Sequence, residues 1–377
     1  MRSLRGNGQG PSEVAASGSD GTNRRTIERR DRPSNAITAG FATGTVRAWR
    51  PRSLQGNRID MTTSYELVTA QQRLPRSAVF SLGDDTAYRR WRDAKLADYP
   101  RSRDELTVEV SDLAHPTRAE TEAILRACRR ANMCLYRTRQ HVSDPSTTRR
   151  ALAAFARHFG LFRFEDHRSA GSDGIVALEV AASGDRSGYI PYTNRSIGWH
   201  TDGYYNYEGL ARMIRAMLLH CVRNADTGGE NGLLDHEIAY IRLRDKNPDH
   251  IAALMHPDAM TIPANEEANG KVRAENTGPV FVLDPEAGGL TMRYTARKRN
   301  IRWREDATTH DAVRALERVL IDDPLVVRVK LAPGEGVICN NVLHDRIGFE
   351  TGKSSQPGRL FYRVRSYDRI RDTDLEV

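Results

Sequence analysis

The sequence predicts a mainly β fold with helical decoration, of the β-sandwich or jelly-roll class. Two patterns indicate this class: short apolar runs separated by turn residues dominate the chain from residue 216 onward, and helical patterns occur before and between those runs. The 377 residues are 39% hydrophobic and 28% charged, which is typical of a globular protein. No stretch of eighteen consecutive apolar residues occurs, so the sequence excludes a membrane-spanning helix.

Residues 1–60 are interpreted as a disordered basic tail. They contain eleven Arg, no Lys and five acidic residues, so this segment carries +6 of the formal net charge of +8. Large apolar side chains are rare in it, and it therefore cannot bury enough surface to offset its ordering entropy. Because the rest of the chain is nearly neutral, no nucleic-acid surface is expected. A targeting peptide and a tail that binds nucleic acid are the alternative interpretations.

Residues 61–106 are expected to form an extension that packs on the core, and residues 107–377 form the main domain. The early helices have recognisable ends, with Pro116 just before the first, and with Ser146 or Thr147 as N-cap and Gly160 as C-cap of the second. In chain order the early elements are a strand at 106–110, a helix at 117–130, a strand at 133–136 and a helix at 146–159.

Short strands make up most of the later chain. They are predicted at 216–221, 280–283, 325–331, 336–340 and 359–367. Two further helices are predicted between them, at 238–246 and 309–321. A basic run after Gly288-Gly289 is expected to form a solvated loop, with a cationic lid over an anionic substrate as the alternative; it consists of Arg293, Arg297, Lys298, Arg299 and Arg302.

The segment Gly198-Trp-His-Thr-Asp-Gly203 is the most informative motif. Side chains two residues apart on extended backbone point to one face, so His200 and Asp202 bring an imidazole nitrogen and a carboxylate oxygen toward one metal ion. His256-Pro-Asp258 has the same spacing. Its proline fixes the backbone and removes a hydrogen-bond donor, so a loop is expected there instead of a metal site.

A second set of polar residues lies late in the chain. A Pro-Gly turn and a strand precede His344, and Arg359 and Arg363 follow a polar loop. The pair at 200 and 202 together with a distant histidine makes a two-His, one-carboxylate set, which suits non-haem Fe(II) and leaves coordination positions for an oxidant and O2. A downstream arginine provides the bidentate donor that a dicarboxylate co-substrate needs.

These motifs resemble the Fe(II)/2-oxoglutarate-dependent dioxygenases of the TauD/TfdA type, the family that includes taurine dioxygenase and γ-butyrobetaine hydroxylase. The resemblance runs from about residue 107 to 368 and includes Leu218-Leu-His-Cys221 and Gly228-Gly-Glu-Asn231. It implies a double-stranded β-helix (jelly roll). It also implies that His200, Asp202 and His344 bind the iron and that Arg359 anchors 2-oxoglutarate.

The sequence departs from the family pattern at two places. Asn231 stands where a hydroxyl residue commonly contacts 2-oxoglutarate, although its amide can still donate a hydrogen bond. The loop before Arg359 is a little longer than usual, so Arg363 remains an alternative anchor for 2-oxoglutarate or a contact for an anionic substrate. The side chains that flank the metal motif are expected to line the substrate pocket: Tyr189, Tyr192, Asn194, Ser196, Tyr204 and Tyr205.

The resemblance implies an enzyme that hydroxylates a C–H bond of a small polar molecule and releases succinate and CO2. Amino acids, betaines, sulfonates and natural-product intermediates are the expected substrates, with Fe(II) as the metal and 2-oxoglutarate and O2 as co-substrates. The alternative is a non-catalytic, metal-binding jelly roll that acts as a sensor or structural module.

Four cysteines without a Cys-x-x-Cys pair indicate neither a disulfide scaffold nor a zinc ribbon. Together with the lack of an apolar run after the first arginines, they favour a cytoplasmic protein with no membrane partner. A homo-oligomer remains open.

Overall fold

The computed structural model describes residues 76–139, 144–165, 171, 173–181, 189–266, 272–284, 288–297, 301–350 and 358–375. They belong to one unit, which runs from Thr69 to Val377. The predicted tail, residues 1–60, lies outside the described residues, as do residues 61–75 of the predicted extension.

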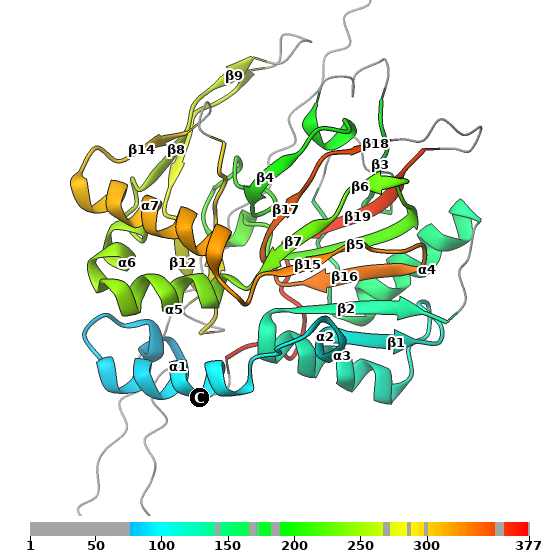
Figure 1. Cartoon of the computed structure of the whole chain (residues 1–377), viewed down its shortest axis with the longest axis horizontal. Helices are drawn as coiled ribbons and strands as arrows, with labels where there is room; N and C mark the ends of the chain where they lie inside the picture. The colour runs from blue at the N-terminus through cyan, green and yellow to red at the C-terminus, as the bar shows by residue number, and fades with distance from the viewer. Residues whose placement is uncertain are drawn as a thin grey trace, which may run out of the picture. The chain divides into compact units, whose positions relative to one another are not determined.

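Two sheets dominate the fold (Figure 1). The larger has the order β1-β2-β16-β5-β19-β3, in which only β1 and β2 are parallel. Its strands are β1 (Thr107–Val110), β2 (Met133–Thr138), β16 (Glu335–Cys339), β5 (Ala216–Arg223), β19 (Leu360–Ser366) and β3 (Ile175–Leu178). The smaller sheet is antiparallel and consists of β15 (Val327–Val329), β7 (Asn231–Leu234), β17 (Leu343–Arg346) and β4 (Ile197–His200).

Alternating side chains of the central strands enter two separate cores. On β5, Met217 and Leu219 join the core that also contains Leu233 and Leu343 of the smaller sheet. Leu218, between them, joins the core under α3 and α4. Because successive side chains of a strand point to opposite faces, the large sheet is covered on one face by the small sheet and on the other by helices. This arrangement is the predicted jelly roll with helical decoration.

The helices on the outer face begin at well-defined caps. A capping box between Thr117 and Glu120 starts α3 (Arg118–Ala131). The side chain of Asp144, and not Ser146 or Thr147 as predicted, caps α4 (Pro145–His158), because Pro145 occupies its first turn. Gly160 follows the C-cap of α4 with a φ of +83°, a conformation that favours glycine.

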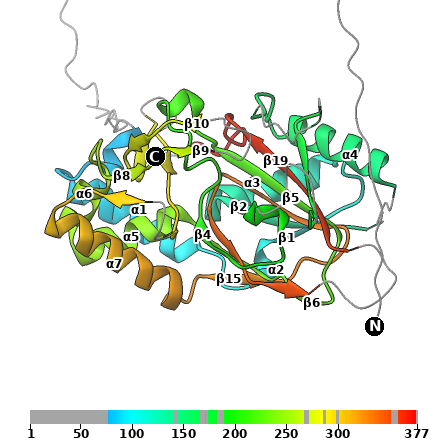
Figure 2. The ribbon, with the colours of Figure 1, turned by 90° about the horizontal axis from the view of Figure 1, so that it is seen from above.

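A second group of helices packs beside the sheets, and Figures 1 and 2 both show α5, α6 and α7 gathered in one cluster. The bounds are α5 (His236–Lys246), α6 (Pro248–Leu254) and α7 (Ala307–Asp322). The predicted helices at 238–246 and 309–321 therefore begin two residues earlier, where the side chains of Asp235 and Asp306 accept hydrogen bonds from the first turns.

Several elements were not predicted. They are the helices α1 (Asp85–Asp98), α2 (Arg103–Leu106) and α6, the single-turn helices η1 (Arg76–Phe80), η2 (Ile190–Tyr192) and η3 (Leu210–Arg212), and the strands β3, β4, β7, β17, β6 (Thr227–Gly228), β8 (Met260–Ile262), β9 (Asn265–Glu266), β10 (Val272–Arg273), β11 (Asn276–Gly278), β13 (Leu290–Met292), β14 (Arg302–Trp303) and β18 (Phe349–Glu350). The strand predicted at 280–283 is β12 (Phe281–Leu283), and the one at 325–331 shortens to β15. None of the helices in the described ranges is both long and apolar enough to span a membrane.

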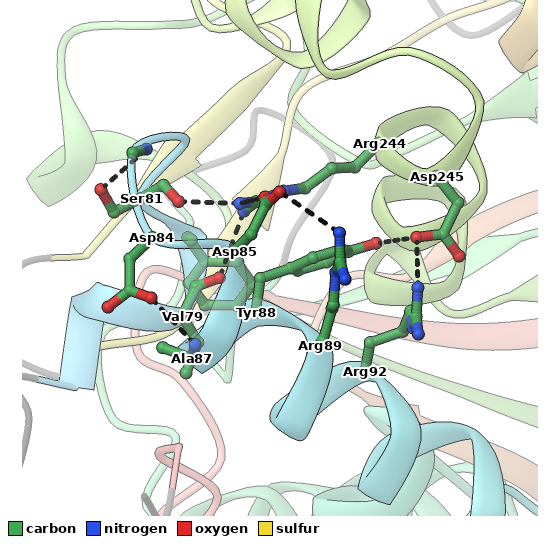
Figure 3. Close-up of polar contacts among 12 residues, drawn as sticks. Val79, Ser81, Asp84, Asp85, Ala87, Tyr88, Arg89, Arg92, Arg244 and Asp245 are labelled. Carbon is green, nitrogen blue, oxygen red and sulfur yellow. Dashed lines mark hydrogen bonds and ion pairs between the residues drawn. The ribbon is translucent and has the colours of Figure 1, made fainter.

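The described part of the extension packs on α5 through buried polar contacts (Figure 3). The guanidinium of Arg244 lies 3.8 Å from the Tyr88 ring centroid and donates hydrogen bonds to the carbonyls of Val79 and Ser81. Tyr88 in turn donates to Asp245 at 2.8 Å. Because Arg244 is almost fully buried, its charge depends on these partners for stabilisation.

Replacing Arg244 with Met should destabilise the fold. The change leaves buried acceptors such as the Val79 carbonyl without a donor, and each orphaned acceptor costs about 1–3 kcal/mol, so we expect a loss of about 2–4 kcal/mol in the free energy of unfolding. Chemical denaturation measures it. Arg89→Gln is the matched control, because its ion pair with Asp85 is exposed and worth less than about 1 kcal/mol. Equal losses in the two variants would contradict this account.

Candidate metal centre

The pairing of β4 with β17 brings the distant histidine to the His-x-Asp motif. In the antiparallel register His344 lies directly opposite His200, and the ring centroids are 4.2 Å apart with the planes tilted by 51°. Ligand atoms of His200, Asp202 and His344 all lie within 4.8 Å of one another. Within the described part of the chain, no other group of three His, Cys, Asp or Glu residues is arranged to hold a metal ion.

Both histidines are oriented by their own backbone. Nδ1 of His200 lies 2.9 Å from the carbonyl of Gly198, and Nδ1 of His344 lies 2.9 Å from the carbonyl of Val342. A carbonyl can only accept, so each Nδ1 donates and each Nε2 is left as a lone-pair ligand. Burial, aided by the neighbouring His344, lowers the pKa of His200 to about 3, and burial also lowers the pKa of His344. Both rings are therefore neutral near pH 7, as metal ligation requires.

Asp202 has one oxygen engaged and one without a partner. Its Oδ1 accepts from Nη1 of Arg363 at 3.0 Å and from Nη1 of Arg365 at 3.4 Å. Its Oδ2 is buried and has no hydrogen-bond partner among the described residues. Burial alone raises the pKa of this carboxyl, but the two guanidinium groups outweigh burial and hold the pKa below its usual range. An orphaned carboxylate oxygen beside two imidazole nitrogens is the donor set that a divalent cation satisfies.

Asn341 fixes the backbone of this carboxylate. Its Oδ1 accepts from the Asp202 amide at 2.8 Å, and its Nδ2 donates to the carbonyls of Asp202 and Ile214 at 3.0 and 2.7 Å. The following Gly203 has a φ of +72°, and a Cβ there would lie 2.5 Å from Ile214. Sequence reasoning missed Asn341; its position directly after the predicted strand at 336–340 was the available signal.

Arg359 is a buried cation without an acidic partner among the described residues. Its guanidinium lies 3.7 Å from the Phe361 ring centroid and 5.0 Å from that of Phe349, and within the described ranges its Nε has no hydrogen-bond partner. Burial, together with the charge of Arg346, lowers its pKa to about 9. A buried guanidinium that lacks a counter-ion indicates a place for an anionic ligand.

Arg346 is a second buried cation at this place, and sequence reasoning missed it. Its guanidinium lies 4.9 Å from the centroid of the Phe349 ring, which Arg359 also contacts. Its Nη2 donates to the carbonyls of Thr193 and Arg195. Its Nε has no hydrogen-bond partner in the described part of the chain, and burial lowers the pKa of Arg346 to about 10. The His-x-Arg spacing from His344 was the available signal.

The predicted co-substrate contact Asn231 is buried on β7. Its Nδ2 donates to the carbonyl of Asp345 at 3.0 Å, whereas no described residue donates a hydrogen bond to its Oδ1. Because a side-chain amide carries two N–H donors, a hydrogen bond from Nδ2 to 2-oxoglutarate is compatible with the one to Asp345.

Two of the predicted substrate residues lie at the metal centre. Tyr204 packs edge-on against the ring of His200, with 6.3 Å between centroids, and Tyr205 packs against Tyr204. The hydroxyl of Tyr205 accepts from Arg365 at 3.1 Å.

The other four predicted substrate residues are arranged differently. Ser196 accepts from the Gly348 amide through Oγ at 2.9 Å, and the carbonyl of Asn194 accepts from the Phe349 amide at 3.0 Å. Both contacts fasten this segment to the loop after β17. Tyr192 is buried and Tyr189 half-buried, in or just before the single turn η2.

The basic run after Gly289 is only partly a solvated loop. Arg293 is buried, and its guanidinium donates to the carbonyls of Tyr204, Met260 and Asn276. Its inclusion in a solvated loop was therefore wrong, because backbone carbonyls take the place of water. Arg302 is exposed and pairs with Glu275, whereas Lys298 and Arg299 lie outside the described residues. His256, which has the same His-x-Asp spacing as the metal motif, lies in a turn after α6, as predicted.

Residues 95–365 match the sequence profile of the family described as taurine catabolism dioxygenase TauD, TfdA family. Two curated relatives are both named uridine-5'-phosphate dioxygenase. The one from Amycolatopsis sp is 34% identical over 162 residues, or 40% of this chain and 54% of that protein. The one from Streptomyces sp is 31% identical over 184 residues, or 47% of this chain and 64% of that protein. The chain therefore spans less than two thirds of the length of either relative.

A solved structure shares the fold. The non-haem iron oxygenase OrfP, in complex with Fe, succinate and (3R,4R)-dihydroxy-L-Arg, aligns with a TM-score of 0.51 over 67% of this chain and 82% of that one. The sequence identity is 15%, so this likeness concerns architecture alone. It supports the double-stranded β-helix that the family resemblance implied.

His200→Ala should abolish metal binding, because it removes one of three converging ligand atoms. Substitution of a residue that only supports a metal ligand typically lowers metal affinity roughly 10- to 100-fold. Loss of the ligand itself should lower the affinity for Co(II) by more than this, and titration of the visible absorption of Co(II) measures it. His256→Ala is the matched control, since it removes a histidine from the same His-x-Asp spacing in a turn. The assignment fails if the two variants bind Co(II) equally well.

Proposed function

Because the chain belongs to the TauD, TfdA family, we propose that it is an Fe(II)- and 2-oxoglutarate-dependent dioxygenase. In this proposal it hydroxylates a C–H bond of a small polar molecule and releases succinate and CO2. The observation that carries the proposal is a buried carboxylate oxygen of Asp202 that has no hydrogen-bond partner among the described residues and lies beside two imidazoles. A buried Arg359 without an acidic partner in the same described ranges supports it.

In the proposed reaction, separate residues would bind the metal, bind 2-oxoglutarate and contact the substrate. His200, Asp202 and His344 would hold the metal, and a ligand set of two histidines and one carboxylate leaves coordination positions for co-substrates. Arg359 binds the far carboxylate of 2-oxoglutarate through charge-assisted hydrogen bonds, and its burial strengthens them by excluding water. Bound Fe(II) supplies the oxidative chemistry that no amino-acid side chain provides. Tyr204 packs beside His200 and gives the substrate side an apolar wall.

Within the class of small polar molecules we favour a nucleoside 5'-phosphate as the substrate. The two relatives that carry the name uridine-5'-phosphate dioxygenase support this choice, at 31–34% identity. A cytoplasmic location also belongs to the proposal, and all four cysteines are buried and free, as expected for a reducing compartment. The competing function is a metal-binding sensor without turnover.

Uridine 5'-phosphate should stimulate succinate formation from 2-oxoglutarate by the Fe(II)-loaded protein in air. Chromatographic quantification of succinate measures it, and a panel of amino acids, betaines and sulfonates tests the other substrate classes. A product heavier than uridine 5'-phosphate by one oxygen would identify hydroxylation. If succinate forms neither with any compound of the panel nor in the assay without added substrate, the metal-binding sensor is the favoured function.

Arg359→Ala should raise the KM for 2-oxoglutarate and leave Co(II) affinity nearly unchanged. A charge-assisted hydrogen bond contributes about 1.5–3 kcal/mol, which corresponds to roughly 10- to 100-fold in KM. Arg363→Ala should instead weaken Co(II) binding, since Arg363 donates to Asp202. If Arg363→Ala raises the KM for 2-oxoglutarate and Arg359→Ala does not, the anchor has been assigned to the wrong arginine.

A further inference from the structure

Asp202 belongs to a row of four buried charges that reaches well beyond the metal centre. The row runs from Arg363 through Asp202 and Arg365 to Glu165, and each of the four residues is less than a tenth exposed. Two acids and two guanidinium groups alternate in it, so the row is neutral as a whole. Buried charges are tolerated only with such pairing.

Arg365 is the link that connects the two acids. One of its terminal nitrogens, Nη1, lies 3.4 Å from Oδ1 of Asp202 and 3.1 Å from the hydroxyl of Tyr205. The other, Nη2, forms an ion pair with Oε2 of Glu165. A planar guanidinium has donors in a fixed fork, so an arginine held at one edge has little freedom at the other.

The backbone fixes Glu165 in the same place. Its amide donates to the Arg365 carbonyl at 2.9 Å, and the neighbouring Phe164 bridges to Ser366 of β19. Arg363 and Arg365 lie two residues apart on β19, and both contact Asp202. Glu165 therefore holds Arg365 both by its main chain and by its carboxylate.

The charge of Glu165 matters for the metal. Without it, Arg363 and Arg365 would set two positive charges against the single negative charge of Asp202, directly beside a cation site. A neutral residue at 165 would therefore leave a net positive charge beside the site, and this charge would lower the affinity of the site for a cation. It would also free Arg365 to turn away from Oδ1, which in turn frees the carboxylate to rotate.

We propose that Glu165 and Arg365 are positioning residues for the metal, which hold Oδ1 of Asp202 so that Oδ2 faces the two histidines, and which keep the row of charges neutral. The proposal rests on the proposed metal site. It assigns a role to two residues that belong neither to the proposed metal ligands nor to the proposed 2-oxoglutarate anchor.

The test measures Co(II) affinity and thermal stability of the full chain side by side. Glu165→Gln preserves the shape of the side chain and removes its charge, and we expect Co(II) affinity to fall roughly 10- to 100-fold. Arg365→Lys keeps every charge but cannot bridge both acids, so it should also weaken Co(II) binding if Glu165→Gln fails to fold. Both variants should alter the ligand-field spectrum of the bound Co(II), because the carboxylate geometry changes.

Asp323→Asn is the matched control, because it breaks the ion pair of another largely buried acid, with Arg242, on the helical side of the fold. It should lower thermal stability and leave Co(II) binding unchanged. The proposal is overturned if Glu165→Gln or Arg365→Lys folds with wild-type Co(II) affinity and spectrum. That outcome differs from failure of the metal site itself, in which the wild-type protein would bind Co(II) no better than His200→Ala.

Discussion

The site depends on one strand pairing, that of β4 with β17 in the register that sets His344 opposite His200. These residues are 144 positions apart, and only the antiparallel ladder brings their rings to 4.2 Å. A shift of one residue would turn His344 to the other face of the sheet. The register is secured from the side, because β17 also pairs with β7 and because Asn341, just before β17, holds the Asp202 backbone.

The sequence predicts best what is local. His200 and Asp202 lie two residues apart, so the pair is visible in the sequence, although Asp202 lies in the turn after β4 and not on the extended backbone that was expected. The apolar spacing gives α3, α4, α5 and α7 to within a few residues. The extension was less visible, because α1 buries little of its surface and is held by polar contacts such as that of Tyr88 with Asp245. The contacts of Glu165 and Asn341 could not be predicted, since they exist only once distant strands have paired.

Buried arginines illustrate how the same residue type serves different ends in one fold. Arg293 is satisfied by backbone carbonyls and acts as a structural brace. Arg365 is satisfied by two carboxylates, one of them a metal-ligand candidate. Arg359 is equally buried, but the part of the chain that the structure describes supplies it with neither kind of partner. Sequence position cannot distinguish these cases, because the difference lies in what the fold places around each guanidinium.

The buried Lys95 of α1 has a consequence for where the polypeptide can be divided. Its Nζ lies between the carboxylates of Asp235 and Glu237 at the start of α5, 2.8 and 2.5 Å away. A shortened chain that began at residue 107 would keep both acids and lose the ammonium that pairs with each of them in the interior. The part of the chain that folds on its own therefore extends N-terminally past β1. Any fusion or truncation must retain α1, the helix that carries Lys95.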